Sequence, residues 1–405
     1  MPRPLPVLQQ SPTEPGFVQD PYGFYERART RGRLFWWQEY GMPCALSHAA
    51  VSQILRDRRF GREPPAGARP EPPDHLKPFF AVEDHSMLEL EGPRHGRLRG
   101  LVLRAFTSAR IAAMAGEIET LCHDLLDAVP EGDVIDLLEH YARLLPMIVV
   151  SRLLGVPEAM APRLLVWSSA MVAMYQARRD RPLEQAAARA AAEFSGLLRD
   201  LAEERRRRPL DDLISALVAA ESEGGRLSPE ELVATCILLL NAAHEATVHT
   251  LGNGVHLLLR HATPPEFLAP DRIEATVEEI LRFDPPMHLF ARHVYEEAEV
   301  MGFRFQPGAR VACLLAAANR DPAAWDDPGV FDPSRLPRTH HAFGAGAHFC
   351  LGAPLARLEL RIALRVLFSR WPEMQLHGRP RYADLYHFHG LSALPVRPGR
   401  RRPRG

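Results

Sequence analysis

One uninterrupted helical stretch, residues 228–261, most constrains the fold of this chain. Ser228 and Glu231 form a capping box at its start, and Pro229 occupies the first helical position. At about 1.5 Å per residue such a helix is roughly 50 Å long, enough to cross a whole globular protein. Its centre, residues 237–240, is apolar on every side, which is typical of a buried helix. We therefore expect a fold built around one long internal helix.

The rest of the sequence predicts a mainly α protein with a small β region. Helical periodicity dominates residues 92–281. The pattern changes after Pro285 and Pro286. Residues 300–305 and 310–315 flank a Gln-Pro-Gly turn, and they predict a β-hairpin. A small sheet beside a mostly helical body is the expected architecture.

Four polar residues interrupt the apolar centre of the long helix: Asn241, His244, Glu245 and Thr247. Buried polar groups cost free energy unless they are paired or useful, so they indicate either a satisfied core network or a functional site. His244 and Glu245, followed by His249, are similar to the zinc motif H-E-x-x-H. The second histidine is at i+5, however, which places the two rings about 140° apart around the helix. A zinc site here is rejected.

Composition excludes several functional classes. The chain has 405 residues, with 49 Lys and Arg against 50 Asp and Glu. It lacks the basic excess of proteins that bind chiefly nucleic acid or anionic membranes. The first residues carry no apolar signal-peptide core, and no apolar run reaches the roughly 18–20 residues of a membrane span. We expect a soluble, cytoplasmic protein, with residues 397–404 as a frayed basic end.

Two features of the chain allow more than one interpretation. The proline-rich residues 62–74 fit either an interdomain linker or a long surface loop. The cysteines are odd in number and widely spaced, which supports neither a disulfide framework nor a zinc ribbon. Buried free thiols are expected for most of the five, which are Cys44, Cys122, Cys236, Cys313 and Cys350.

A second helix is expected to begin at Asp271, with Glu274 completing its cap, and to stop before Pro285. On it, Glu279 and Arg282 stand at i and i+3 and can form an ion pair. An exposed pair of this kind contributes only about a few tenths of a kcal/mol. Its spacing alone therefore indicates no function.

Cys350 differs from the other cysteines because it lies in a glycine-rich loop, residues 343–352, before an amphipathic helix that extends to about residue 370. Two glycines before the thiol and one after it permit a tight turn. The helix start supplies unpaired N–H groups and a positive dipole end, which favour a thiolate. A lone thiolate without a second ligand at chelating spacing suits a single axial bond to a cofactor iron. A plain glycine loop is the alternative.

This loop resembles the haem-binding loop of the cytochrome P450 family, F-x-x-G-x-x-x-C-x-G. Phe343, Gly346, Cys350 and Gly352 match it. The resemblance implies haem b (iron protoporphyrin IX) as the cofactor. It implies Cys350 as the only protein ligand of the iron, with Phe343 and Gly346 contributing to the binding loop.

The resemblance covers residues 21–396, and it implies a single domain over residues 1–405. Residues 1–20 and 397–405 would be flexible ends. The fold would be the family's triangular helical fold with a long central helix. Residues 62–74 would then be a loop within that domain, and no longer a linker.

The resemblance also assigns roles to charged residues. The family's E-x-x-R pair and a downstream arginine form a buried structural network behind the haem, and they match Glu279, Arg282 and Arg335. Haem carries two carboxylates, which require cationic partners. The family's propionate-binding positions fall on His95, Arg99, Arg292 and His348.

By this resemblance the protein is a monooxygenase that activates O2 and inserts one oxygen atom into a hydrophobic small organic molecule, as in secondary metabolism. The thiolate promotes O–O cleavage. Electrons would come from a separate ferredoxin and ferredoxin reductase, and neither nucleic acid nor a membrane is an expected partner.

One position departs from the family pattern. The long helix of the family carries [A/G]-G-x-[D/E]-T, whose acid and alcohol relay protons. Here Glu245 supplies the acid, but Ala246 stands where the threonine is expected. Thr247 follows, rotated by about 100° around the helix. Substrate-assisted proton delivery is one interpretation. Oxidative coupling or rearrangement without net hydroxylation is the alternative, and a non-catalytic haem sensor is a third hypothesis.

The substrate pocket is expected to be largely apolar. By family position it would be lined by Phe79, Phe80, Asn241, Ala242, Leu289, Phe290 and His389. His389, like His288 nearby, is a candidate polar anchor, although packing is the alternative for each. A hydrophobic molecule with one or two polar groups is the expected substrate class.

Overall fold

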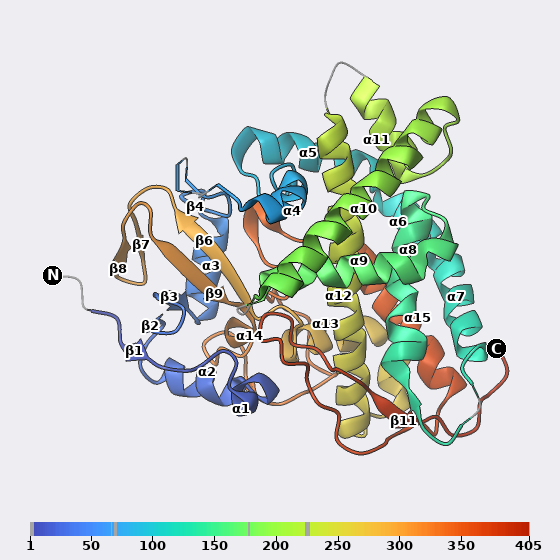
Figure 1. Ribbon diagram of the computed structural model, residues 1–405. Helices are drawn as coiled ribbons and strands as arrows, with labels where there is room; N and C mark the ends of the chain where they lie inside the picture. The colour runs from blue at the N-terminus through green and yellow to red at the C-terminus, as the bar shows by residue number, and fades with distance from the viewer. Residues whose placement is uncertain are drawn as a thin grey trace. The chain divides into compact units, whose positions relative to one another are not determined.

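The structure is a computed structural model that describes residues 4–65, 67–68, 71–130, 132–176, 179–222 and 227–404 (Figure 1). Contacts within the chain divide it into two compact, interleaved units. The first unit consists of residues 1–65, 119–142 and 248–405, and the second of residues 66–118 and 143–247. Mainly α architecture with a small β region is confirmed.

The second unit contains helices and no strand among its described residues. In it α10 (Arg181–Arg207) contacts α4 (Lys77–Glu83), α9 (Ala161–Val172) and α11 (Leu213–Ser222). Asp180 caps α10 by accepting a hydrogen bond from the backbone N–H of Leu183. The remaining α-helices wholly within this unit are α5 (Gly92–Ala105), α6 (Ser108–Ala113) and α8 (Leu144–Leu154).

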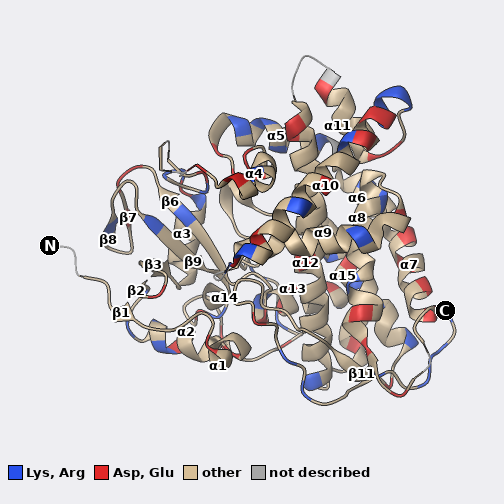
Figure 2. Cartoon of the chain, viewed as in Figure 1, with Lys and Arg blue, Asp and Glu red and all other residues tan. Residues whose placement is uncertain are grey.

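The long helix is α12 (Pro229–Arg260), and its predicted capping box is confirmed. The backbone N–H of Glu231 donates to Ser228 Oγ at 3.1 Å, and that of Ser228 donates to a carboxylate oxygen of Glu231 at 3.0 Å. After Glu231 and before Arg260, Glu245 is the only Asp, Glu, Lys or Arg on this helix (Figure 2). By length and composition α12 could cross a membrane, but 56% of the apolar window is buried in the protein, as in the core helix of a globular protein.

The main sheet belongs to the first unit and has the strand order β1-β2-β3-β9-β6-β4. β3 pairs with β9 in parallel, and β9 pairs with β6 antiparallel, with Arg292 opposite Val311. The strands are β1 (Val7–Leu8), β2 (Leu34–Trp37), β3 (Met42–Ala45), β4 (Phe60–Gly61), β6 (Leu289–Val294) and β9 (Arg310–Leu314).

The predicted hairpin of residues 300–305 with 310–315 is wrong. β8 (Phe303–Phe305) pairs with β7 (Ala298–Val300), through a turn at Met301 and Gly302. Both turn residues have positive φ, at 51° and 79°, which suits a two-residue hairpin loop. The Pro-Gly turn instead carries the chain from β8 to β9, which joins the larger sheet.

Short helices and a third sheet complete the first unit. A three-stranded sheet has the order β10-β11-β5, with strands Gln375–Leu376, Pro395–Arg397 and Ile135–Asp136. Residues Leu138–Ala142 form a turn of π-helix. The α-helices are α1 (Pro15–Gln19), α2 (Tyr22–Arg29), α3 (His48–Arg56), α13 (Ile273–Phe283), α14 (Leu315–Ala318) and α15 (Ala353–Arg370). α7 (Ala115–Asp127) contributes residues to both units.

Two local predictions about helix ends have different outcomes. α15 ends at Arg370, as expected. The cap predicted for the second helix is wrong, because α13 begins at Ile273 after Arg272, with no side-chain hydrogen bond at its cap. A helix held by a buried face does not need this cap, and α13 buries Ile273, Val277 and Ile280.

The sheet separates two hydrophobic clusters in the first unit. One contains side chains of α3 and β7, such as Val51, Ile54 and Val300. The other is rich in aromatic residues of α1, α2 and β2, with Phe17, Phe24, Phe35 and Trp37 buried. Because β6 and β9 contribute to both clusters, each face of the central strands is covered.

Both chain ends make contacts, which differs from the expectation of free ends. β1 pairs with β2, and Phe17 is buried. At the other end, Arg404 forms ion pairs with Asp124 and Asp127 of α7. The carbonyl oxygen of Arg402 accepts a hydrogen bond from Arg370 at 2.7 Å. An acidic turn of α7 therefore holds the basic tail.

The proline-rich stretch contains no helix or strand among its described residues from Arg62 to Pro73. A single 3₁₀ turn, Asp74–Leu76, follows it. The first boundary between the two units falls at Pro65.

Candidate functional site

The loop before α15 holds Cys350 through its own backbone. The N–H of Cys350 donates to the carbonyl oxygen of Phe343 at 3.0 Å, and that of Phe349 donates to Gly346 at 3.1 Å. Gly344 and Gly346 have φ of 69° and 71°, a left-handed conformation that glycine adopts at little cost. The predicted glycine loop is therefore a tight turn that closes on the cysteine.

Gly346 lies directly against α3. A Cβ atom there would overlap the carbonyl oxygen of Leu55, well inside van der Waals contact. At Gly344 a Cβ atom would lie 3.2 Å from the ring of Phe290 on β6. The loop is thus fixed by close backbone approach to α3 as well as by its φ angles.

Gly346→Ala is expected to lower the free energy of unfolding by about 1–3 kcal/mol more than Gly378→Ala. Gly378 also has a positive φ, 75°, but a Cβ atom there meets nothing within 4 Å. Both variants place an alanine at a positive φ, which strains the backbone. Only in Gly346→Ala does the new Cβ atom also collide with α3. Urea unfolding of the purified proteins measures the difference. Equal losses would contradict the close packing against Leu55.

Cys350 is the only one of the five cysteines that is not buried. Burial raises the pKa of Cys122, Cys236 and Cys313 to about 12 and raises that of Cys44 well above its usual range, so these four remain protonated. The chemistry of a thiol that is only partly buried fits a single sulfur ligand to iron.

A clamp that sequence reasoning missed holds the ring of Phe343. Arg357 of α15 lies over this ring, with its Cζ 4.6 Å from the centroid. The guanidinium binds Glu278 of α13 through two hydrogen bonds, of 2.6 and 2.8 Å, and His340 lies 3.2 Å from the same carboxylate. Burial acts to raise the pKa of Glu278, but the bonds from Arg357 and His340 lower it to about 2. The carboxylate therefore stays charged and anchors the loop to α13.

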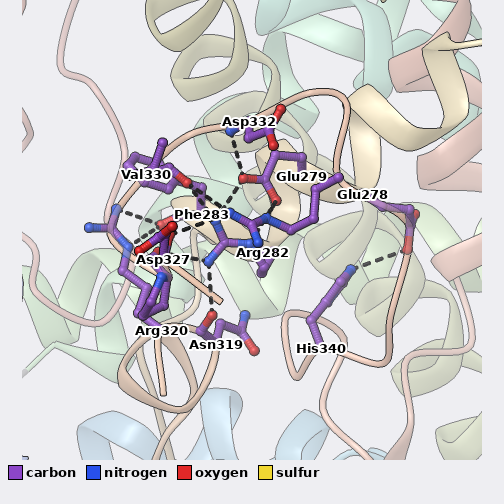
Figure 3. A network of polar contacts seen from close by, with 12 residues as sticks. Glu278, Glu279, Arg282, Phe283, Asn319, Arg320, Asp327, Val330, Asp332 and His340 are labelled. Atoms are coloured by element: carbon purple, nitrogen blue, oxygen red, sulfur yellow. Dashed lines mark hydrogen bonds and ion pairs between the residues drawn. The ribbon is translucent and has the colours of Figure 1, made fainter. Parts of the chain in front are cut away.

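The predicted structural trio lies together in the first unit, and Figure 3 shows its central pair, Glu279 and Arg282. Arg282 donates two hydrogen bonds of 2.7 Å to Glu279, and Arg335 lies 3.4 Å from the same carboxylate. Both side chains of the central pair are 1% exposed. Three carbonyl oxygens accept further bonds from Arg282, those of Asn319, Pro328 and Val330. The pair is thus a buried, multiply bonded network and not the exposed pair that spacing alone allowed.

The four predicted propionate-binding residues are divided between the units. In the first unit, His348 lies in the 3₁₀ turn Gly346–His348 of the cysteine loop, and Arg292 lies on β6. Arg292 is buried and donates to the carbonyl oxygen of Ala291 at 2.9 Å. In the second unit, α5 carries both His95, which is buried, and Arg99, which is half-buried.

The predicted acid of α12 has a partner that the sequence did not indicate. Ser169 of α9 donates a hydrogen bond to Glu245 at 3.0 Å, and His244 Nδ1 lies 3.7 Å from the same oxygen. Ala246 is half-buried and Thr247 is buried. Ser169 is far from Glu245 in the sequence and belongs to no motif, so only the packing of α9 reveals it.

The expected pocket residues have mixed surroundings. In the second unit, Phe79 and Phe80 meet edge to face with centroids 5.4 Å apart, and Asn241 Nδ2 lies 3.8 Å from Met171 Sδ. Ala242, on the same helix, is exposed. In the first unit, Leu289 is buried and Phe290 is half-buried.

His389, the expected polar anchor, is placed in the core. Its ring stacks on Tyr382 with centroids 3.8 Å apart, and it is 1% exposed. His288 is fully buried and hydrogen-bonded to Tyr25. These contacts favour the packing alternative for both histidines.

Comparison with known proteins gives consistent matches over nearly the whole chain. The family model described as Cytochrome P450 matches residues 36–264 and 273–378. The chain is 37% identical over 416 residues to "Cytochrome P450 monooxygenase PikC" of Streptomyces venezuelae, covering 99% of this chain and 96% of that protein. It is 39% identical to "6-deoxyerythronolide B hydroxylase" of Saccharopolyspora erythraea, covering 75% and 74%.

A solved structure agrees with these relatives. The crystal structure of P450BioI in complex with hexadec-9Z-enoic acid ligated acyl carrier protein is 33% identical to this chain, with a TM-score of 0.88. The match covers 94% of this chain and 99% of that one. Fold and sequence therefore point to the same family.

Proposed function

The chain belongs to the cytochrome P450 family of haem monooxygenases, and on that premise we propose that it inserts one oxygen atom of O2 into a hydrophobic small organic molecule. The observation that carries this proposal is the Cys350 loop, in which the one accessible thiol of the chain follows a glycine cradle. Haem, when bound, supplies O2 activation. The Cys350 thiolate would hold the iron and donate electron density to it.

The cationic residues would hold the carboxylates of the cofactor. His348 and Arg292 would do so from the first unit, and His95 and Arg99 from α5. Charge-assisted hydrogen bonds of this kind are about twice as strong as neutral ones, and they fix orientation.

We propose that Glu245 is the last group of the protein in the path that delivers protons to the reaction. Glu245 is hydrogen-bonded to Ser169 and lies near His244, so protons can reach its carboxylate through side chains. Ala246 offers no hydroxyl to carry them further. General acid catalysis contributes typically about 10²–10⁴-fold in rate, so a replacement donor is required. We propose that the native substrate, or a water it holds, supplies that hydroxyl.

Ala246→Thr is expected to raise the product formed per NAD(P)H consumed several-fold for simple hydrocarbons, because it restores a protein hydroxyl. For the native substrate it should bring little benefit, or a loss through steric conflict. Product and NAD(P)H consumption are measured for both proteins with both substrate types.

Thr247→Val is the matched control. Thr247 is rotated by about 100° from Ala246, so removing its hydroxyl should leave coupling unchanged. Tight coupling of the unmodified enzyme on a substrate with no polar group near the reacting carbon would refute substrate-assisted delivery.

The second candidate is oxidative coupling or rearrangement without net hydroxylation, which the alanine at position 246 also favours. Turnover under ¹⁸O2 distinguishes the two. Insertion places one labelled oxygen in the product, whereas coupling or rearrangement leaves the product unlabelled. Substrates are tested free and attached to an acyl carrier protein, because the solved relative was bound to such a carrier.

The electron donors are proposed to be a ferredoxin and its reductase, in the cytoplasm. Phe349, next to Cys350, is 39% exposed, which gives a donor an apolar contact beside the thiolate. Failure of a ferredoxin and its reductase to reduce the haem-loaded protein would contradict this proposal.

A further inference from the structure

A buried cluster of three ligand-type side chains lies in the first unit and has no part in the proposed reaction. Asp284 follows α13, His288 precedes β6, and His389 comes from the C-terminal segment. One ligand atom from each lies within 4.8 Å of the others. The three residues are 2%, 0% and 1% exposed.

Three histidine nitrogens in this cluster have no hydrogen-bond partner among the described residues: His288 Nε2 and both ring nitrogens of His389. His389 Nδ1 lies 3.2 Å from an oxygen of Asp284, but without the alignment of a hydrogen bond. Leaving a buried polar group unsatisfied costs about 1–3 kcal/mol. His288 Nε2 and one nitrogen of His389 can face a single species beside the Asp284 carboxylate, which indicates that a bound ion completes them.

The outward-facing atoms of His288 and Asp284 are already satisfied. His288 Nδ1 is hydrogen-bonded to Tyr25 at 2.9 Å, which leaves Nε2 as the free ligand atom. Asp284 accepts bonds of 2.7 Å from Tyr22 and 2.6 Å from Tyr382. Metal-binding histidines and carboxylates are typically oriented by such outer partners.

The protonation states suit a cation. Burial lowers the pKa of His288, so its ring is neutral and offers a lone pair. The phenols of Tyr22 and Tyr382 donate hydrogen bonds to Asp284, which favours the charged carboxylate. The carboxylate offsets one of the two charges of a divalent ion.

We propose that Asp284, His288 and His389 bind a divalent transition-metal ion, with zinc as the expected occupant, at a structural site. Bonds of about 2.0–2.1 Å in a tetrahedron place neighbouring ligand atoms roughly 3.3 Å apart. His389 Nδ1 and an oxygen of Asp284 already meet this spacing at 3.2 Å. Water or a neighbouring phenol takes the fourth position. The ion ties the end of α13 to the C-terminal segment.

The test measures zinc in the haem-bound protein. Protein stripped with a chelator is dialysed against zinc chloride and then analysed for zinc and iron by mass spectrometry, alongside His288→Asn, His389→Asn and His387→Asn. His387 is a neighbouring half-buried histidine outside the cluster. We expect one zinc per chain in the unmodified protein and in His387→Asn. We expect at least a tenfold loss of affinity in the two ligand variants.

Two further measurements keep the proposal testable if a ligand variant fails to fold. Tyr25→Phe keeps all three ligands and should weaken zinc binding by about 10–100-fold. X-ray absorption at the zinc edge should show only nitrogen and oxygen neighbours. Zinc bound through sulfur, zinc lost equally in His387→Asn, or no stoichiometric zinc in the unmodified protein would each overturn the proposal.

Discussion

Replacing Cys350 with alanine abolishes the strongly red-shifted Soret band that a thiolate gives in the reduced, carbon-monoxide-bound protein. The expected effect is complete, because no other described cysteine can take its place. The other four are buried, and burial keeps their thiols protonated. The difference spectrum of reduced protein with and without carbon monoxide measures it directly.

Alanine at each of the other cysteines is the matched control. Cys44, Cys122, Cys236 and Cys313 should all be replaceable with the red-shifted band retained, although each substitution disturbs packing. Iron content of every variant is measured beside the spectrum, so that loss of haem is separated from loss of the sulfur ligand. If one of these four variants lost the band while keeping its haem, the ligand assignment would be wrong.

Glu279→Ala is expected to give little soluble, haem-loaded protein. The substitution leaves Arg282 as a buried cation without a carboxylate, and removing one partner of a buried ion pair typically costs about 3–5 kcal/mol. The backbone N–H of Asp332 also loses its acceptor, because it donates to Glu279 at 2.9 Å. Soluble yield, haem content and urea unfolding are the measurements.

Glu274→Ala provides the control on the same helix. Glu274 is 71% exposed and lies 3.6 Å from Arg361, an arrangement that contributes at most about 1 kcal/mol. This variant should behave as the unmodified protein does. Glu279→Gln keeps the shape of the side chain and should recover part of the yield. Normal unfolding of Glu279→Ala holoprotein would count against a structural role for the trio.

The sequence predicted the features that depend on local chemistry or on a strict motif. The capping box of α12 follows from Ser228, Pro229 and Glu231 alone, because these residues satisfy one another within one turn. The cysteine loop could be recognised because its glycines are required by backbone conformation. Both signals lie within about ten residues, where spacing determines geometry.

The missed features depend on contacts between distant segments. β8 has the same alternating pattern whether it pairs with β7 or with β9, so the choice of partner was decided by the turn at Met301 and Gly302. No residue close to Glu278 in the sequence predicts its hydrogen bonds with Arg357 of α15. His389 was read as a pocket residue by its position, whereas its direction is set by Asp284 and Tyr382.

The interleaving of the two units also imposes an order on biosynthesis. β3 pairs with β9 inside the first unit, so the ribosome must reach Leu314 before this strand pairing can form. At a translation rate of about 5–20 residues per second, the edge of β3 that later pairs with β9 stays unpaired for on the order of 10–60 s. An unpaired strand edge can form hydrogen bonds with strands of other chains. Newly made protein is therefore exposed to pairing between chains during this interval, and Cys350 becomes available for the cofactor only after β9 has been made.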